Sequence, residues 1–105
     1  MNDLSKLTRL EVIVPARDAP AIRELIASAG ATGYTSVSGV PGIGHRGQHS
    51  GAVLVTDHDT LTILITVLPP DKAGDLIDAV RELLSTSSGV MFVADSDVSG
   101  PDYVP

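Results

Sequence analysis

The residues with the clearest capacity for chemistry lie in one glycine-rich stretch, residues 30–51, which holds seven of the ten glycines in the chain. Glycine lets backbone N–H groups approach a ligand closely, and a run of such groups forms a concave site for anions such as phosphate. Glycine clusters are also typical of a hairpin connection that binds nothing. The stretch therefore indicates either an anion-binding loop or a plain connection.

Arg46 is the cation that this stretch offers to an anion. It is the only Lys or Arg between Arg23 and Lys72. A guanidinium donates forked hydrogen bonds to phosphate or carboxylate. A solvated surface arginine is the alternative. Backbone N–H groups of residues 42–47 are expected to hold an anion beside it.

Residues 42–47, Gly-Ile-Gly-His-Arg-Gly, match the G-x-G-x-x-G pattern of dinucleotide-binding folds. That motif has to follow the first strand and open a helix. Here it follows the second predicted strand and opens a polar loop, so we reject the dinucleotide-fold interpretation.

Three histidines, His45, His49 and His58, offer an alternative metal site together with Asp57 and Asp59. Histidine and carboxylate side chains are common zinc ligands. However, the surrounding glycines disfavour a helix that would place His45 and His49 on one face. Solvated loop histidines and a metal site both stay open.

Catalysis finds little support among the side chains. Ser50 lies beside His49, but no third group is available to orient the base, as a nucleophilic hydrolase requires. The absence of cysteine excludes a thiolate nucleophile and a disulfide. We therefore expect a protein that is not an enzyme.

The composition narrows the classes of partner. The chain has 105 residues, enough for one domain, and a net charge of −6. Nucleic acids and anionic membranes both attract basic surfaces, so this charge argues against either partner. The longest apolar run, within Leu61–Leu68, is too short to span a bilayer, and the first residues lack the layout of a signal peptide. We expect a cytoplasmic protein.

Hydrophobic periodicity predicts four strands and two helices. Asp18 is the expected N-cap of the first helix and Gly30 the residue that ends it. The tail from about 95 to 105 is acidic and rich in Pro and Gly, so we expect it to be irregular. The expected elements are strands at Leu7–Val14, Tyr34–Val40, Leu61–Leu68 and Gly89–Ala94, and helices at Asp18–Ala29 and Ala73–Leu84.

This βαββαβ order predicts an α+β, ferredoxin-like fold, in which two helices cover one face of a four-stranded antiparallel sheet. Leu61–Leu68 is apolar at nearly every position, whereas a strand with one exposed face should alternate. An open apolar face of this kind is typical of contact with another subunit. We therefore expect an oligomer.

Three motifs resemble the PII-like signalling proteins, relatives of the nitrogen-regulatory PII family: G-x-x-G-Y-T at Gly30–Thr35, G-I-G-H-R-G at residues 42–47, and S-S-G-V-M-F at Ser87–Phe92. The resemblance covers nearly the whole chain as one domain, residues 1–105. It implies a homotrimer that binds adenine nucleotides in three clefts between subunits. It also implies a mobile loop, about Gly42–Thr60, that contacts a protein target such as a transporter or metabolic enzyme.

The resemblance implies two groups of nucleotide-binding residues. One subunit's second strand and loop entry contribute the first group, and its neighbour or the adjoining loop contributes the second. The groups are Thr35, Gly42, Ile43, Gly44, His45, Arg46 and Gly47, and Ser88, Gly89, Val90 and Met91.

Departures from the nitrogen-regulatory pattern favour a particular branch of the PII-like proteins. The loop is shorter and has no tyrosine, Ser85–Gly89 lacks a phosphate-clamping lysine, and Asp95 and Asp97 stand where a basic pair is expected. The chain is more similar to the branch associated with carboxysomes and bicarbonate transporters. That implies AMP and ADP in preference to ATP, bicarbonate as a second ligand, no cofactor, and regulation of inorganic-carbon or nitrogen uptake or metabolism. A trimeric metal-binding protein similar to the CutA family is the alternative.

Overall fold

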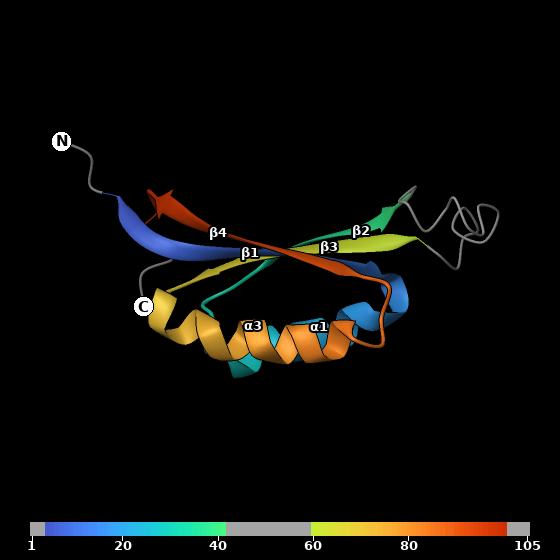
Figure 1. The fold of residues 1–105 in the computed structure, drawn as a ribbon. Helices are drawn as coiled ribbons and strands as arrows, with labels where there is room; N and C mark the ends of the chain where they lie inside the picture. The colour runs from blue at the N-terminus through green and yellow to red at the C-terminus, as the bar shows by residue number, and fades with distance from the viewer. Residues whose placement is uncertain (1–3, 42–59, 101–105) are drawn as a thin grey trace.

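The structure is a computed structural model that describes residues 4–41 and 60–100. The strands and helices follow the expected order along the chain (Figure 1). They are β1 (Ser5–Pro15), the short 3-10 helix η1 (Ala16–Asp18), α1 (Ala19–Ser28), β2 (Thr35–Val40), β3 (Leu61–Leu68), α3 (Pro70–Leu84) and β4 (Val90–Val98).

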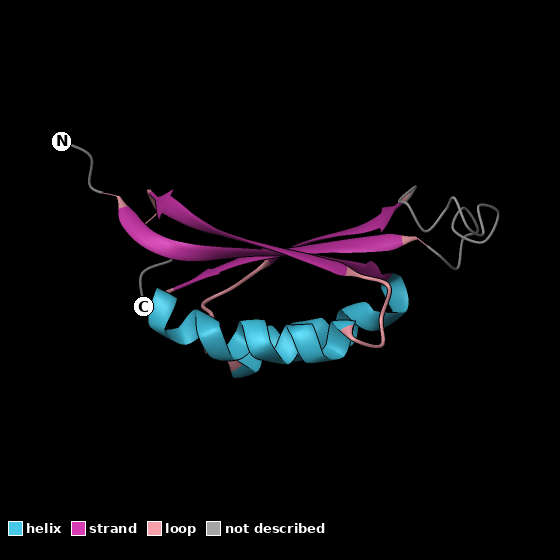
Figure 2. Ribbon diagram, viewed as in Figure 1, coloured by secondary structure: helices cyan, strands magenta, loops and turns pink. Residues whose placement is uncertain are grey.

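The four strands form one antiparallel sheet in the order β2-β3-β1-β4. Both long helices pack against the same face of this sheet, so the molecule has two layers (Figure 2). The ferredoxin-like α+β fold expected from the sequence is confirmed.

The core lies between the two layers. Alternate residues of β1, namely Leu10, Val12 and Val14, point toward the helices and are fully buried, as the period of two in the sequence predicts. The helices contribute apolar residues at helical spacing, and these pack with the β1 residues in one cluster. From β3 and the helices the cluster includes Leu64, Leu68, Ile22, Ile26, Leu76 and Val80.

The prediction for the first helix was correct at its C-terminal end and partly wrong at its N-terminal end. Gly30 follows the last helical turn with φ +83°, the left-handed conformation that glycine adopts without strain, so its expected role is confirmed. Asp18 occupies the N-cap position, but its side chain makes no capping hydrogen bond. The expected capping hydrogen bond was therefore wrong, because the Asp18 carboxylate accepts a hydrogen bond from Ser87 instead.

Strand β4 runs to Val98, four residues beyond the expected end, so the expectation of an irregular chain from Asp95 is corrected for Asp95–Val98. The physical reason is that β1 begins earlier than predicted and offers partners to this segment. Ser5 pairs with Val98 and Lys6 with Asp97. Charged residues such as Asp97 are well tolerated because β4 is an edge strand.

The sheet face away from the helices carries a continuous apolar row. Val37, Ile63, Ile13 and Val90 lie opposite one another across all four strands, and residues directly opposite in an antiparallel pair share a face. Phe92 stands in the next row, 55% exposed. Glu11 stands in the same row as Phe92, and it forms an ion pair at 3.1 Å with Arg9 of the row beyond.

Two expected segments lie largely outside the described residues: the loop at about 42–60 and the last part of the tail, 101–105. Within the part of the chain that the structure describes, no helix is both long and apolar enough to cross a membrane.

Candidate functional site

Several connections meet at one end of the sheet. Val40, the last residue of β2, pairs with Leu61 at the start of β3, and Leu61 pairs with Pro15 at the end of β1. Val90 opens β4 beside Ile13 at the same end. The chain that leads toward Gly42 and the connection before β4 therefore face the same side of the molecule (Figure 1).

The described members of the two expected groups, Thr35 in β2 and Ser88–Met91 at the start of β4, nevertheless lie at opposite edges of the sheet. β2 and β4 are the edge strands, with β3 and β1 between them. Three inter-strand spacings separate them by about 14 Å. A hydrogen-bonded anion reaches only about 3 Å. One chain alone therefore does not join the end of β2 to the start of β4 around a phosphate.

The individual residues divide as follows. Thr35 is exposed at the start of β2, opposite Ile65 and away from the Val40 end. Ser88 and Gly89 are half-buried in the α3–β4 connection, Val90 is exposed, and Met91 packs against the core. The rest of the expected set lies outside the described residues: Gly42, Ile43, Gly44, His45, Arg46 and Gly47.

Gly89 lies hard against the end of β1. A Cβ on this residue would lie 2.5 Å from Val14 Cγ1, 2.7 Å from the Ile13 carbonyl oxygen and 2.9 Å from Leu84 Cδ2. No side chain fits there without movement of β1 or α3. The glycine therefore has a packing reason for its place, independent of any ligand.

Hydrogen bonds also hold the α3–β4 connection in place. The Ser87 hydroxyl donates to Asp18 Oδ2 at 2.8 Å, and the Gly89 N–H donates to Ser87 Oγ at 3.2 Å. The Gly89 N–H therefore has a partner within the chain, and the expected role of Gly89 in nucleotide binding stays a prediction.

The sequence did not indicate Arg17 as a basic residue at this end of the sheet. Arg17 lies in η1 and is exposed. The Ala16 N–H of the same short helix donates to the Thr60 carbonyl at 3.0 Å, which places η1 beside the chain that enters β3. Arg17 and Thr60 are far apart in sequence, so only the pairing of β1 with β3 reveals a basic residue at this end of the sheet.

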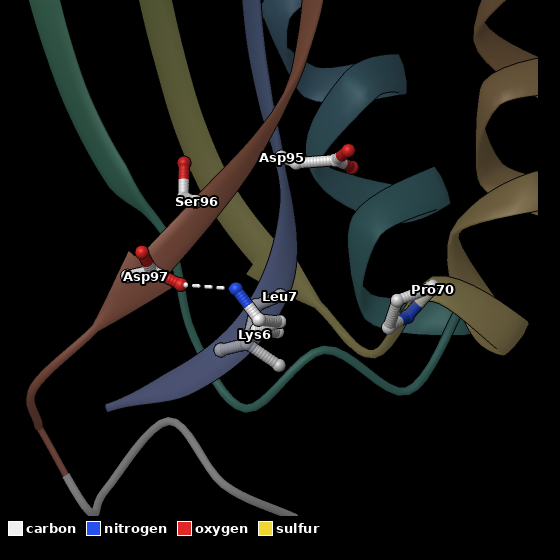
Figure 3. Close-up of a pocket in the computed structure, with 6 residues that line it drawn as sticks. All are labelled: Lys6, Leu7, Pro70, Asp95, Ser96 and Asp97. Atoms are coloured by element: carbon white, nitrogen blue, oxygen red, sulfur yellow. Dashed lines mark hydrogen bonds and ion pairs between the residues drawn. The ribbon is translucent and has the colours of Figure 1, made fainter. Parts of the chain in front are cut away.

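A pocket of about 430 Å³ opens at the other end of the sheet, where β4 ends and α3 begins (Figure 3). Its only cation, Lys6, reaches across to Asp97 at 3.1 Å. Together with Asp95 the lining has more carboxylates than ammonium groups, which disfavours a phosphate ligand. The lining residues are Lys6, Leu7, Pro70, Asp95, Ser96 and Asp97.

Within residues 4–41 and 60–100, no group of three or more His, Cys, Asp or Glu residues is placed to hold a metal ion. The expected alternative ligands, His45, His49 and His58, lie outside the described residues.

The model of the family "Nitrogen regulatory protein P-II" matches residues 7–102 of this chain. The chain belongs to this family. Membership of the P-II family confirms the resemblance drawn from Gly30–Thr35, residues 42–47 and Ser87–Phe92. Among curated proteins, none matches the sequence.

Solved structures with the P-II fold include CPII, a nitrogen regulatory PII-like protein from Thiomonas intermedia K12. Its complex with ADP and bicarbonate is 29% identical to this chain, with a TM-score of 0.80 and 96% of each chain covered. Its complex with ADP, AMP and acetate is 27% identical, with a TM-score of 0.77 and 96% and 97% covered. A chain from Thermus thermophilus, 23% identical with a TM-score of 0.74 over 99% and 100%, shares the fold.

Proposed function

We propose that this protein is a trimeric, non-enzymatic sensor that binds adenine nucleotides in clefts between subunits. The observation that carries the proposal is the similarity to CPII, which binds ADP, AMP and bicarbonate, over 96% of this chain. P-II family membership favours this function over a metal-binding protein similar to CutA.

The separation of the two residue groups supports a site between subunits. A phosphate that contacts both the end of β2 and the start of β4 is better held between neighbouring chains, because one chain holds these two edges about 14 Å apart. The apolar row of Val37, Ile63, Ile13 and Val90 supplies a surface for such neighbours.

The proposed ligands are AMP and ADP in preference to ATP, with bicarbonate as a second ligand. The charge count supports this order, since each added phosphate brings negative charge toward a chain of net charge −6. Arg46 is the only lysine or arginine between Arg23 and Lys72, and neither residue type occurs in Ser85–Gly89.

The segment at about 42–60 is the proposed output. It leaves and re-enters the sheet at the end that carries the proposed site, so a ligand there is well placed to alter its contacts with a protein target. The proposed targets act in inorganic-carbon or nitrogen uptake or metabolism, and the proposed location is the cytoplasm.

Isothermal titration of the purified chain tests the ligands. AMP, ADP and ATP are each titrated with and without bicarbonate, and a divalent metal is titrated separately. We expect AMP and ADP to bind more tightly than ATP. Tight binding of the metal with no nucleotide binding would overturn the proposal in favour of the metal-binding alternative.

A further inference from the structure

We propose that Asp18 is a positioning residue for the nucleotide site: through Ser87 it holds the α3–β4 connection in the shape that presents Ser88–Met91. The inference rests on the proposed function. Asp18 does not touch the expected ligand residues itself, and it acts through the hydrogen bonds that reach them.

The first observation is the long-range bond of Asp18. Its carboxylate stands at the start of α1 but leaves the helix end uncapped. Instead it accepts a hydrogen bond of 2.8 Å from Ser87, 69 positions away in the sequence. Hydrogen bonds to a charged group are stronger than neutral ones. This contact therefore ties the α3–β4 connection to the start of α1.

The second observation is that the tie continues to a predicted ligand residue. Ser87 Oγ accepts the Gly89 N–H at 3.2 Å, so one hydroxyl bridges Asp18 and the backbone of Gly89. Ser88 lies between two anchored residues. On the other side, Gly89 packs within contact of Val14, Ile13 and Leu84. The connection is thus fixed by hydrogen bonds and by packing.

Neighbouring hydroxyls of the connection bond differently. The Ser85 hydroxyl donates to the Glu82 carbonyl, and the Thr86 hydroxyl donates to the Leu83 carbonyl, both within α3. Of the described contacts made by these three side chains, only that of Ser87 leaves the helix end. This difference makes Ser85→Ala a matched control for Ser87→Ala.

The test compares ADP affinity among variants of the whole chain by calorimetry. Loss of a hydrogen bond to a charged group predicts about tenfold weaker ADP binding for both Asp18→Ala and Ser87→Ala. The double variant should be no weaker than either single one, because both remove the same tie. Asp18→Asn keeps an acceptor for Ser87, so it should retain most of the affinity.

The controls are Ser85→Ala and Asp75→Ala, the latter an exposed carboxylate on α3. Both should bind ADP like the parent. Hydrogen exchange without nucleotide gives a second readout, in which the Gly89 amide should exchange faster in Asp18→Ala and Ser87→Ala only. A purely structural loss would instead lower protection across β1 and β3 as well.

The outcomes separate the two proposals. Failure of the parent to bind ADP or AMP overturns the proposed function and this role with it. ADP binding by the parent that is unchanged in Asp18→Ala overturns only the role of Asp18. Additive losses in the double variant would also overturn it, since they would mean that Asp18 and Ser87 act separately.

Discussion

Packing requires glycine at position 89, whether or not a ligand binds there. The nearest obstacle to a side chain is the Val14 methyl, and the next is the Ile13 carbonyl, part of the β1 backbone that pairs on both sides. A flexible side chain can move aside, whereas a central strand cannot without loss of its ladder. The glycine that the sequence marked as a ligand residue is therefore also required by packing.

Replacement of Gly89 with Ala should lower the free energy of unfolding by about 1–3 kcal/mol, the usual cost of overpacking. Urea denaturation at fixed protein concentration measures it. Gly74→Ala is the control, because Gly74 lies in α3 with nothing within 4 Å of its Cβ position. That change should stabilise by about 0.5–1 kcal/mol. A Gly89→Ala midpoint equal to that of the parent would contradict the packing argument.

Arg46 belongs to the proposed phosphate contact, and Arg46→Ala should weaken ADP binding by about ten- to a hundredfold, from about 1.5–3 kcal/mol for charge-assisted hydrogen bonds. Lys72→Ala, which removes the same charge at the start of α3, should leave ADP affinity unchanged. Calorimetry on both variants decides the matter. Equal losses would show a general charge effect rather than a contact.

Among the elements, β4 extends to Val98 because its backbone pairs with β1, and not because of the Lys6–Asp97 ion pair. Lys6 and Asp97 have side chains that are 87% and 53% exposed, and exposed pairs contribute about 0–1 kcal/mol. Lys6→Ala should therefore change the unfolding free energy by less than about 1 kcal/mol. Amide exchange should still show β4 paired as far as Val98, and fraying of Asp95–Val98 would disprove this.

Much of the fold was predictable because it rests on local patterns. Leu10, Val12 and Val14 alternate, the helices repeat at helical spacing, and Gly30 ends α1 as its type requires. The end of β4 was missed because Asp95 and Asp97 have low strand propensity, and only the earlier start of β1 compensates for them.

The candidate site was less accessible to sequence reasoning. Gly89 and its neighbours were singled out, but the partners of this connection, Asp18 and Ser87, lie 69 positions apart. The proximity of Arg17 to the chain entering β3 likewise depends on which strand ends meet. Such juxtapositions follow from topology, and no local period encodes them.

For the whole molecule, the apolar open face predicts association. Burial of such a surface stabilises by about 25 cal/mol per Å². Ile63 lies in the middle of the apolar row, so Ile63→Asp should convert the proposed trimer into a monomer of 10.9 kDa. Val93→Asp is the control, since Val93 pairs with Leu10 and so points to the helix side of the edge strand.

Light scattering at micromolar concentration measures the mass of the parent and both variants. The parent and Val93→Asp should have three times the mass of one chain. A monomeric parent would contradict the use of this face, and so would an Ile63→Asp variant that keeps the parent's mass.

The placement of β2 and β4 at opposite edges has a consequence for assemblies that mix two variants. If each cleft takes one half from each of two neighbours, defects in different halves should complement in mixed assemblies. Subunits carrying Arg46→Ala retain a sound β4 side, and subunits carrying Asp18→Ala retain a sound β2 side. When the two are unfolded and refolded together, a fraction of the clefts receives both sound halves. The mixture should then contain high-affinity ADP sites that neither variant has alone, whereas a site built within one chain would gain nothing from the mixing.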